Sequence, residues 1–461
     1  MSTIMNITEE DIDNPEKCRK YTVSIVECSK VGVTHACLFT AAGFKVMGVS
    51  TNPHIFELLK KGRTPFSEKE YLVLERRLKE GLFTACSDVR KAASESDVIL
   101  IAIQTSVDIR KKPDYSMLER VCKEVGMGLK KGSLILFVSV TGPGVVENSM
   151  REILEKSSGL KAGVDFGLAS SPVQTSWMEK ADDPAKFPRI VGAFDELSLR
   201  VASLVLGKLS RTEIIGVSNI RTAEALNLFQ NINSEISKAA ANELAFLCER
   251  LRIDFSEVLE TAEKARVFHL PPPGIINGSA RRDFYLLREE AENVNLDLRL
   301  TRMARRINDE IAKYTFRQVK DALKVCGKTV RRSKISVLGV SRRPNAKEPP
   351  EALTKSIIKL LKSKVRVVQV YDPFFTKKEL TEFGFEAEKL SKVVEKTDCL
   401  VILAAHSKFG RLNLRKVKLL AKKSPAIVDI SHVINPVKAE KNGFVYRGLC
   451  PQSLEISSPK V

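Results

Sequence analysis

The sequence lacks a run of apolar residues long enough to cross a membrane, and its first 21 residues have no apolar centre of the kind found in secretion signals. We therefore expect a protein of the cytoplasm without a membrane span. Aromatic residues make up only 6% of the chain and do not alternate with the basic clusters. This distribution provides no stacking platform for single-stranded nucleic acid, so nucleic acid is not the expected partner.

The chain also lacks any closely spaced pair of cysteines. Its nine cysteines are scattered without a C-x-x-C motif, and its five histidines show no metal-ligand spacing. Free thiols are the default for a large chain of this kind, so we predict neither a disulfide framework nor a metal site.

Basic residues are in excess. Lysine and arginine number 75 against 56 acidic residues, which gives a formal charge of +19. Such a charge favours anionic partners, including nucleotides, nucleic acid and anionic lipid, although a solvated basic surface explains it equally simply.

Apolar runs that alternate with helical segments dominate both ends of the chain. Strands are predicted at residues 21–26, 45–49, 97–103, 133–139, 334–339, 365–371, 398–403 and 426–429, and long helices at 219–252 and 296–325. Near-continuous apolar strands that alternate with helices indicate parallel sheets covered on both faces. The predicted fold class is α/β, with two Rossmann-like doubly wound parallel sheets joined by a central helical domain. The expected divisions are an extension at 1–20 and domains at 21–205, 206–325 and 326–461.

Short segments along the chain carry a resemblance to one family. They lie at residues 41–49, 60–66, 221–224, 242–244, 306–309, 370–373, 397–400, 406–407 and 446–448. In order and spacing they resemble the UDP-glucose/GDP-mannose dehydrogenase family, most of all its UDP-N-acetylmannosamine dehydrogenase branch, across roughly residues 21 to 450. The resemblance implies a Rossmann domain for NAD, central helices that form a homodimer, and a C-terminal domain for a UDP-sugar. It also implies a cysteine nucleophile that carries the sugar through two oxidations.

The cofactor loop departs from the family pattern. The G-x-G-x-x-G motif falls on residues 27–32, where Glu27 and Ser29 replace two glycines and only Gly32 remains, with Lys30 between them. Ser50 replaces the acidic residue that holds the ribose diol. Gly32, Lys30 and Ser50 are the candidate cofactor residues. NAD is implied by resemblance, Glu27 opposes phosphate, and Ser50 leaves NADP open.

The catalytic positions are altered in the same way. Ser279 stands at the place of the nucleophilic cysteine and Asn227 at that of the lysine, whereas Asn231 and Asp283 match the family. A serine hydroxyl needs an adjacent base to act as a nucleophile, and the nearest candidate is Asp283.

The substrate positions differ too. Arg342 and Arg343 replace the family's Tyr-Lys segment, and residues 348–353 lack the arginine that reaches a neighbouring substrate. The guanidinium groups of Arg342 and Arg343 suit a phosphate, and Tyr285 completes the candidate substrate residues.

Three functions remain open. The first is a catalytically inactive member of the family that binds a UDP-sugar or another anion, or pairs with an active paralogue. The second is a diverged NAD(P)-dependent nucleotide-sugar oxidoreductase that stops after one oxidation. The third is a polyanion or nucleic-acid binder on a reused Rossmann scaffold.

Overall fold

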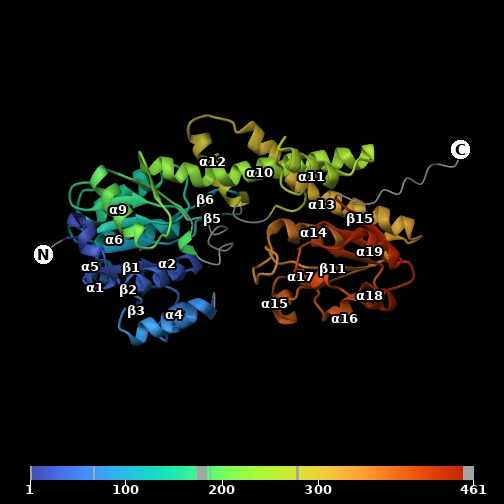
Figure 1. The fold of residues 1–461 in the computed structure, drawn as a ribbon, viewed down its shortest axis with the longest axis horizontal. Coiled ribbons are helices and arrows are strands. Elements are labelled where there is room, and N and C mark those ends of the chain that lie inside the picture. Colours follow the sequence, from blue (N-terminus) through green and yellow to red (C-terminus); the bar gives the residue numbers. More distant parts are fainter. Residues whose placement is uncertain are drawn as a thin grey trace. The chain divides into compact units, whose positions relative to one another are not determined.

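The computed structural model describes residues 3–65, 68–108, 110–173, 184–186, 188–276 and 280–449. The chain divides into two compact units. The first comprises Met1–Asn231 with Arg282–Asp297, and the second comprises Ile232–Arg281 with Leu298–Val461. Figure 1 shows their helices and strands in sequence colours.

An eight-stranded sheet forms the centre of the first unit. In chain order its strands are β1 (Thr22–Val26), β2 (Lys45–Val49), β3 (Phe83–Cys86), β4 (Val98–Ile101), β7 (Leu134–Phe137), β8 (Gly167–Ser170), β9 (Arg189–Ala193) and β10 (Ile214–Val217). Their order across the sheet is β10-β9-β8-β7-β4-β1-β2-β3. A short antiparallel pair, β5 (Ser106–Val107) and β6 (Pro113–Asp114), lies apart from the sheet. The predicted α/β class is confirmed.

Two strands differ from the parallel prediction. β9 pairs with β8 in the antiparallel direction, and β10, which is parallel to β9, is reversed with it. The sequence could not show this reversal, because an apolar strand reads alike in either direction.

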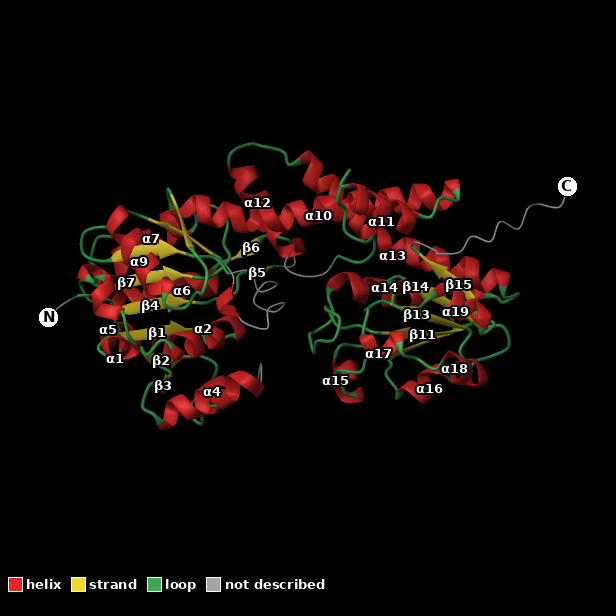
Figure 2. Ribbon diagram, in the orientation of Figure 1, coloured by secondary structure: helices red, strands yellow, loops and turns green. Residues whose placement is uncertain are grey.

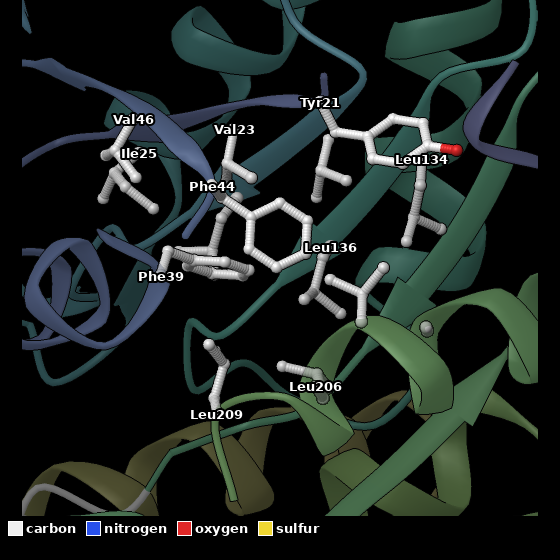
Figure 3. Packing of buried hydrophobic residues seen from close by; sticks show 14 of the residues in the cluster. Tyr21, Val23, Ile25, Phe39, Phe44, Val46, Leu134, Leu136, Leu206 and Leu209 are labelled. Atoms are coloured by element: carbon white, nitrogen blue, oxygen red, sulfur yellow. The ribbon is translucent and has the colours of Figure 1, made fainter. Parts of the chain in front are cut away.

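Helices cover both faces of the sheet. They are α2 (Lys30–Ala41), α3 (Pro53–Leu59), α4 (Glu68–Lys79), α5 (Val89–Glu95), α6 (Ser116–Gly128), α7 (Arg151–Ser158) with the π-helical turn Val146–Met150, and α9 (Glu196–Gly207). Alternate side chains of β4 pack in different hydrophobic clusters, one on each face of the sheet. Val98 and Leu100 belong to the first cluster, and Ile99 and Ile101 belong to the second. Figure 3 shows the first cluster, in which Phe39 and Phe44 pack near the strand residues. Burial on both faces explains why β4 and β7 are apolar at every position.

The N-terminal segment is part of this core. It consists of the short helices Ile4–Asn6, Glu9–Ile12 and α1 (Pro15–Cys18). Ile4, Ile7 and Ile12 are fully buried in the same cluster as β1 and β7. The guanidinium of Arg200 donates hydrogen bonds to the carbonyl oxygens of Ile7, at 2.8 Å, and Met5, at 3.4 Å. The segment predicted as an extension therefore contributes to the first unit.

Four helices make up the middle of the chain: α10 (Ile220–Leu251), α11 (Phe255–Ala265), α12 (Ala280–Asn293) and α13 (Arg299–Val325). α10 and α13 match the two predicted helical stretches closely. The first turns of α10 belong to the first unit together with most of α12, while the rest of α10 belongs to the second. A further helix, Pro184–Lys186, is a single 3-10 turn.

The second unit is built on a five-stranded parallel sheet. Its strands are β11 (Lys334–Leu338), β12 (Val367–Tyr371), β13 (Cys399–Ile402), β14 (Ala426–Asp429) and β15 (Val445–Gly448), in the order β12-β11-β13-β14-β15. Around it lie α14 (Ala352–Lys362), α15 (Lys377–Glu382), α16 (Leu390–Val394), α17 (Ser407–Gly410), α18 (Leu414–Leu420), α19 (Pro436–Lys441) and the 3-10 turn Val330–Arg332. Figure 2 shows helices on both sides of this sheet. Two buried clusters, one on each face, again make the sheet doubly wound.

No helix within the described ranges is long and apolar enough to cross a membrane.

Candidate nucleotide and catalytic sites

The loop after β1 has an unusual backbone at Glu27. This residue has a φ of +66°, in the left-handed region that disfavours any residue with a Cβ atom. Five residues later, a Cβ added to Gly32 would lie only 2.5 Å from the carbonyl oxygen of Glu27. The tight turn and the close approach of helix and strand that the glycine motif normally provides are therefore both present. Glutamate adopts the turn that a glycine would make freely.

The side chain of Glu27 reaches the end of the neighbouring strand. Its carboxylate accepts hydrogen bonds from the hydroxyl of Ser50, at 3.3 Å, and from that of Thr51, at 3.4 Å. Ser50 is buried, and its oxygen also accepts a hydrogen bond from the backbone N–H of Asn52. A carboxylate thus lies at the carboxyl end of β2, where dinucleotide-binding folds place an acid, but it is carried by β1.

Ser29 occupies the point where the strand order of the sheet reverses. The sheet runs from β1 to β2 and β3 in one direction and to β4 in the other, and ligands of such folds bind in the crevice at this reversal. The hydroxyl of Ser29 donates a hydrogen bond of 3.2 Å to the carbonyl oxygen of Ala102, directly after β4. A serine side chain therefore spans this crevice, where the family has a glycine.

These contacts decide how well NAD fits. The carboxylate of Glu27 lies where the fold places the acid that accepts from the ribose diol of a dinucleotide. The pyrophosphate does not fit its ordinary pose, because Ser29 bridges the space that the second glycine leaves open. Lys30 is the first residue of α2, and the Cα of Gly32 packs against the carbonyl of Glu27 in the loop after β1. The candidate cofactor residues are together, but their side chains do not form an open phosphate cradle.

Two candidate catalytic residues are in contact. Asp283 on α12 is fully buried, and its carboxylate accepts a hydrogen bond from the amide of Asn231 on α10. The guanidinium of Arg282 pairs with the same carboxylate at 2.6 Å. The amide and the guanidinium together use three of the about four acceptor positions of this carboxylate, and the side chain is closed to solvent. Ser279 and Gly278 lie outside the described residues, so the predicted Ser279–Asp283 pair stays a prediction.

Asn227, at the lysine position, also lies in this region. Its side chain is 6% exposed and donates a hydrogen bond of 3.3 Å to the carbonyl oxygen of Pro172. An amide donor replaces the cation that would stabilise a developing oxyanion. Tyr285 is likewise buried, with its ring against Phe284 and the guanidinium of Arg288 over its face at 5.2 Å.

Glu224 is a buried acid that the sequence reasoning did not single out as a site residue. Its carboxylate accepts hydrogen bonds from the hydroxyl of Thr141, at 2.7 Å, and from the N–H groups of Gly144, at 2.6 Å, and Val146, at 3.3 Å. Burial raises its pKa to about 7. The only sequence signal was its place in the segment 221–224, which carried the family resemblance.

In the second unit, the candidate arginines bind an acid of their own chain. The Nε atoms of Arg342 and Arg343 lie 2.8 Å and 2.9 Å from one carboxylate oxygen of Glu348, and Arg343 also reaches the other oxygen. Their guanidinium groups hold the pKa of Glu348 below its usual value. A carboxylate therefore already lies where these two residues were expected to meet a phosphate.

The second unit also contains a cavity of about 540 Å³. Its walls come from α11, from residues 268–273 and from the segment after β14. Apolar surfaces dominate, among them Leu259, Phe268, Ile434 and Tyr446, with the imidazole of His432 also at the wall. A cavity of this size and lining is typical of a site for a small organic ligand.

Lys238 places a positive charge next to that cavity. Its amine donates a hydrogen bond to the carbonyl oxygen of Pro272, which lines the cavity, and burial lowers its pKa to about 8. Burial likewise lowers the pKa of His432, although the nearby Asp429 opposes this effect. Nothing in the sequence pattern marked Lys238, because a lysine in a long helix is usually exposed. Across the described part of the chain, no group of three histidine, cysteine or acidic residues could hold a metal ion.

Comparison with known proteins agrees with these features. Three domains of the UDP-glucose/GDP-mannose dehydrogenase family match the chain: the NAD binding domain at residues 21–208, the central domain at 221–310 and the UDP binding domain at 336–436. The UDP-N-acetyl-D-mannosamine dehydrogenase of Pyrococcus horikoshii is 27% identical over 435 residues, covering 93% of this chain and 98% of that protein. Protein CapL of Staphylococcus aureus is 28% identical over 421 residues, which cover 90% of this chain and 96% of that protein.

Solved structures give the same answer. The UDP-D-ManNAc dehydrogenase of Pyrococcus horikoshii superposes with a TM-score of 0.83 at 26% identity, covering 93% of this chain and 99% of that one. The NDP-N-acetyl-D-galactosaminuronic acid dehydrogenase of Methanosarcina mazei superposes with a TM-score of 0.78 at 26% identity, covering 95% of this chain and 98% of that one. The three matched domains, together with the two doubly wound sheets, show that this chain belongs to the UDP-glucose/GDP-mannose dehydrogenase family.

Proposed function

We propose that this chain is a catalytically inactive member of its family that binds a nucleotide sugar, or a related anionic nucleotide, in the second unit. The observation that carries the proposal is the buried contact of Asn227 with the carbonyl of Pro172, because an amide stands where the family's oxyanion-stabilising lysine would be. Ser279 in place of cysteine adds a second, independent loss.

The state of Asp283 supports the same conclusion. In the family this aspartate helps to orient water, which requires a carboxylate oxygen that faces the substrate. Here the carboxylate is fully buried and accepts from Arg282 and Asn231. The site therefore keeps a packed polar network, while asparagine and serine stand where the family has its lysine and its cysteine.

Binding has separate support. The UDP binding domain of the family matches residues 336–436, and the cavity borders this domain through His432 to Pro436. The apolar wall suits a base, while the partly buried amine of Lys238 favours a negative charge nearby, because an anion would offset the desolvation of its charged form.

Titration calorimetry with UDP, UDP-N-acetylmannosamine and UDP-glucose tests the binding part. We expect at least one of them to bind in the micromolar range, and Lys238→Gln to weaken it about tenfold or more. Lys264→Gln, on the exposed side of α11, is the matched control and leaves the affinity unchanged. Binding of none of the three ligands would refute a nucleotide-sugar site.

Absorbance at 340 nm tests the loss of catalysis. Each ligand is incubated with NAD or with NADP, and no reduced cofactor is expected. Sustained production of reduced cofactor would instead establish the second candidate, a diverged NAD(P)-dependent oxidoreductase, which the preserved contact of Asn231 with Asp283 favours.

We further propose that the central helices form a homodimer. On α10, Leu244, Leu247 and Leu251 follow a helical spacing of three and four residues and are 39%, 50% and 59% exposed. Light scattering should give twice the mass of one chain, and Leu247→Asp should give a monomer. An active paralogue as partner would show instead as a monomer that pairs only with that second protein.

The charge of +19 keeps a polyanion binder as the third candidate. Its affinity for duplex DNA would fall steeply with salt, because phosphate contacts release counterions. We expect weak binding without such a slope. A steep slope would favour this candidate over the nucleotide-sugar site.

A further inference from the structure

We propose that Lys238 is a nucleophile that forms an imine with a small, uncharged aldehyde or ketone held in the apolar cavity of the second unit. The inference goes beyond the proposed function, because it needs a carbonyl group in the cavity and not a nucleotide sugar. It gives a chemical role to a lysine of α10 that the sequence pattern did not mark.

The first support is the place of the amine beside the cavity. Lys238 donates a hydrogen bond to the carbonyl oxygen of Pro272, which lines the cavity together with Leu270 and Pro273. The charge of Lys238 also lowers the pKa of His432, another residue of the cavity wall, so the amine and the imidazole lie near each other. All of these residues belong to the second unit. The amine therefore lies beside space that a ligand can enter.

The second support is the charge state of the amine. No carboxylate in the described part of the chain forms an ion pair with Lys238, and burial alone lowers the pKa of its amine to about 8. At pH 7 about one such amine in ten is uncharged, against fewer than about one in a thousand for an ordinary lysine. Desolvation of this kind activates a lysine, because only the uncharged amine has a lone pair to give.

The third support is the bond that Lys238 makes in place of an ion pair. Its partner is the neutral carbonyl oxygen of Pro272, so the bond positions the nitrogen without holding it in the protonated form. An uncharged amine has two hydrogens and one lone pair. It can therefore keep donating to Pro272 while its lone pair stays available to a carbonyl carbon.

The wall of the cavity indicates the class of ligand. Its volume of about 540 Å³ admits a small organic molecule, and Leu259, Phe268 and Ile434 offer it apolar surface. The two acids of the wall, Glu260 and Glu263, are exposed, so they remain hydrated at its edge. An uncharged aldehyde or ketone with an apolar body matches this lining.

The reaction needs no further reactant. The lone pair of the amine attacks the carbonyl carbon, a C–N bond forms, and one proton passes from nitrogen to oxygen to give a carbinolamine. The carbinolamine then takes up a proton, loses its oxygen as water and leaves a protonated imine. Nothing is oxidised or reduced, and addition of water reverses both steps.

Reductive trapping on the full chain tests the proposal. The protein is incubated with benzaldehyde and cyanoborohydride, which reduces an imine to a stable benzyl adduct, and peptide mass spectrometry follows the adduct at each lysine. Lys238 is expected to react at least about tenfold faster than Lys264, an exposed lysine of α11 that serves as internal reference. The rate at Lys238 should rise with pH and reach half of its plateau near pH 8.

Two controls separate the cavity from general reactivity. Glyceraldehyde is an aldehyde with a hydrophilic body that gains nothing from the apolar wall, so the preference for Lys238 should fall to about twofold or less. Lys238→Arg keeps the positive charge, but its guanidinium does not act as an amine nucleophile. This variant should lose the rapidly formed adduct and leave the rate at Lys264 unchanged.

No nucleotide is present in these reactions, so their outcome is separate from the titrations with UDP and the UDP-sugars. Rapid trapping at Lys238 without binding of any nucleotide would refute the proposed function and support this inference. The inference is overturned if Lys238 reacts no faster than Lys264, if glyceraldehyde shows the same preference as benzaldehyde, or if Lys238→Arg keeps the rapidly formed adduct.

Discussion

The amine of Lys238 donates its hydrogen bond to the carbonyl of Pro272, a residue of the cavity wall in the second unit. The helix α10 thereby holds a positive charge in a place that excludes most water. The charge contacts a neutral oxygen in this bond, so its desolvation is not compensated by a full negative charge there. This relationship leads to the first prediction.

Lys238 should make the stability of the protein depend on pH between about 8 and 10.5. Its pKa in the folded state is about 8 against 10.5 in a free side chain, so the unfolded state binds more protons in this window and stability rises with pH. Lys238→Met should therefore raise the free energy of unfolding by on the order of 2 kcal/mol at pH 7, and by much less near pH 10.5. Urea unfolding at both pH values measures this difference; an equal gain at both would contradict the assigned pKa.

Asp283→Asn should destabilise the protein by about 3 kcal/mol, because it removes the charge partner of Arg282 from a buried site. Asp321→Asn makes the same chemical change on an exposed part of α13 and should cost less than about 0.5 kcal/mol. Chemical denaturation of both variants gives the comparison. Similar costs for the two would mean that the Arg282 pair contributes little.

Glu27→Gly should be more stable than Glu27→Ala by about 1 kcal/mol. Both variants remove the carboxylate, but only glycine adopts the φ of +66° without the penalty of a Cβ atom. Their difference in free energy of unfolding therefore isolates the backbone conformation. If alanine proved equally stable, the turn would have to adopt another conformation in that variant.

Ile7→Ala should cost about 2 to 4 kcal/mol, because Ile7 is fully buried in the main core of the first unit. The matched control is Val164→Ala, which shortens a side chain that is 84% exposed and should change stability by less than about 0.5 kcal/mol. Thermal unfolding of the two variants checks the expectation. A small effect of Ile7→Ala would show that the N-terminal segment is not firmly packed.

Eight strands of the two sheets could be predicted because burial on two faces leaves a continuous apolar run, as at residues 98–101 and 399–402. The strands β3, β8, β9, β10 and β15 were not predicted, because glycine or polar residues interrupt their short apolar runs. The contribution of the N-terminal segment could not be predicted in this way. Its buried residues, Ile4, Ile7 and Ile12, are separated by polar ones and fit neither a strand nor a regular helix.

The sequence predicted which residues belong to the candidate sites, but not which side chains contact one another there. Asn231 and Asp283 were each assigned to a catalytic position by their places in the family pattern, and the structure shows that their side chains are in contact, which had not been predicted. The direction of the Glu27 side chain and the pairing of Arg342 and Arg343 with Glu348 could not be predicted. Each depends on how a loop turns, and loop geometry is set by a few dihedral angles that a residue pattern does not specify.

The bonds from Arg200 to the carbonyl oxygens of Met5 and Ile7 also have a consequence for synthesis on the ribosome. These partners are separated by more than 190 positions. At a translation rate of roughly 5 to 20 residues per second, about 10 to 40 s pass between their appearances. During that interval Ile4, Ile7 and Ile12 have no completed surface to cover them, so these side chains are accessible to chaperones until residue 200 arrives.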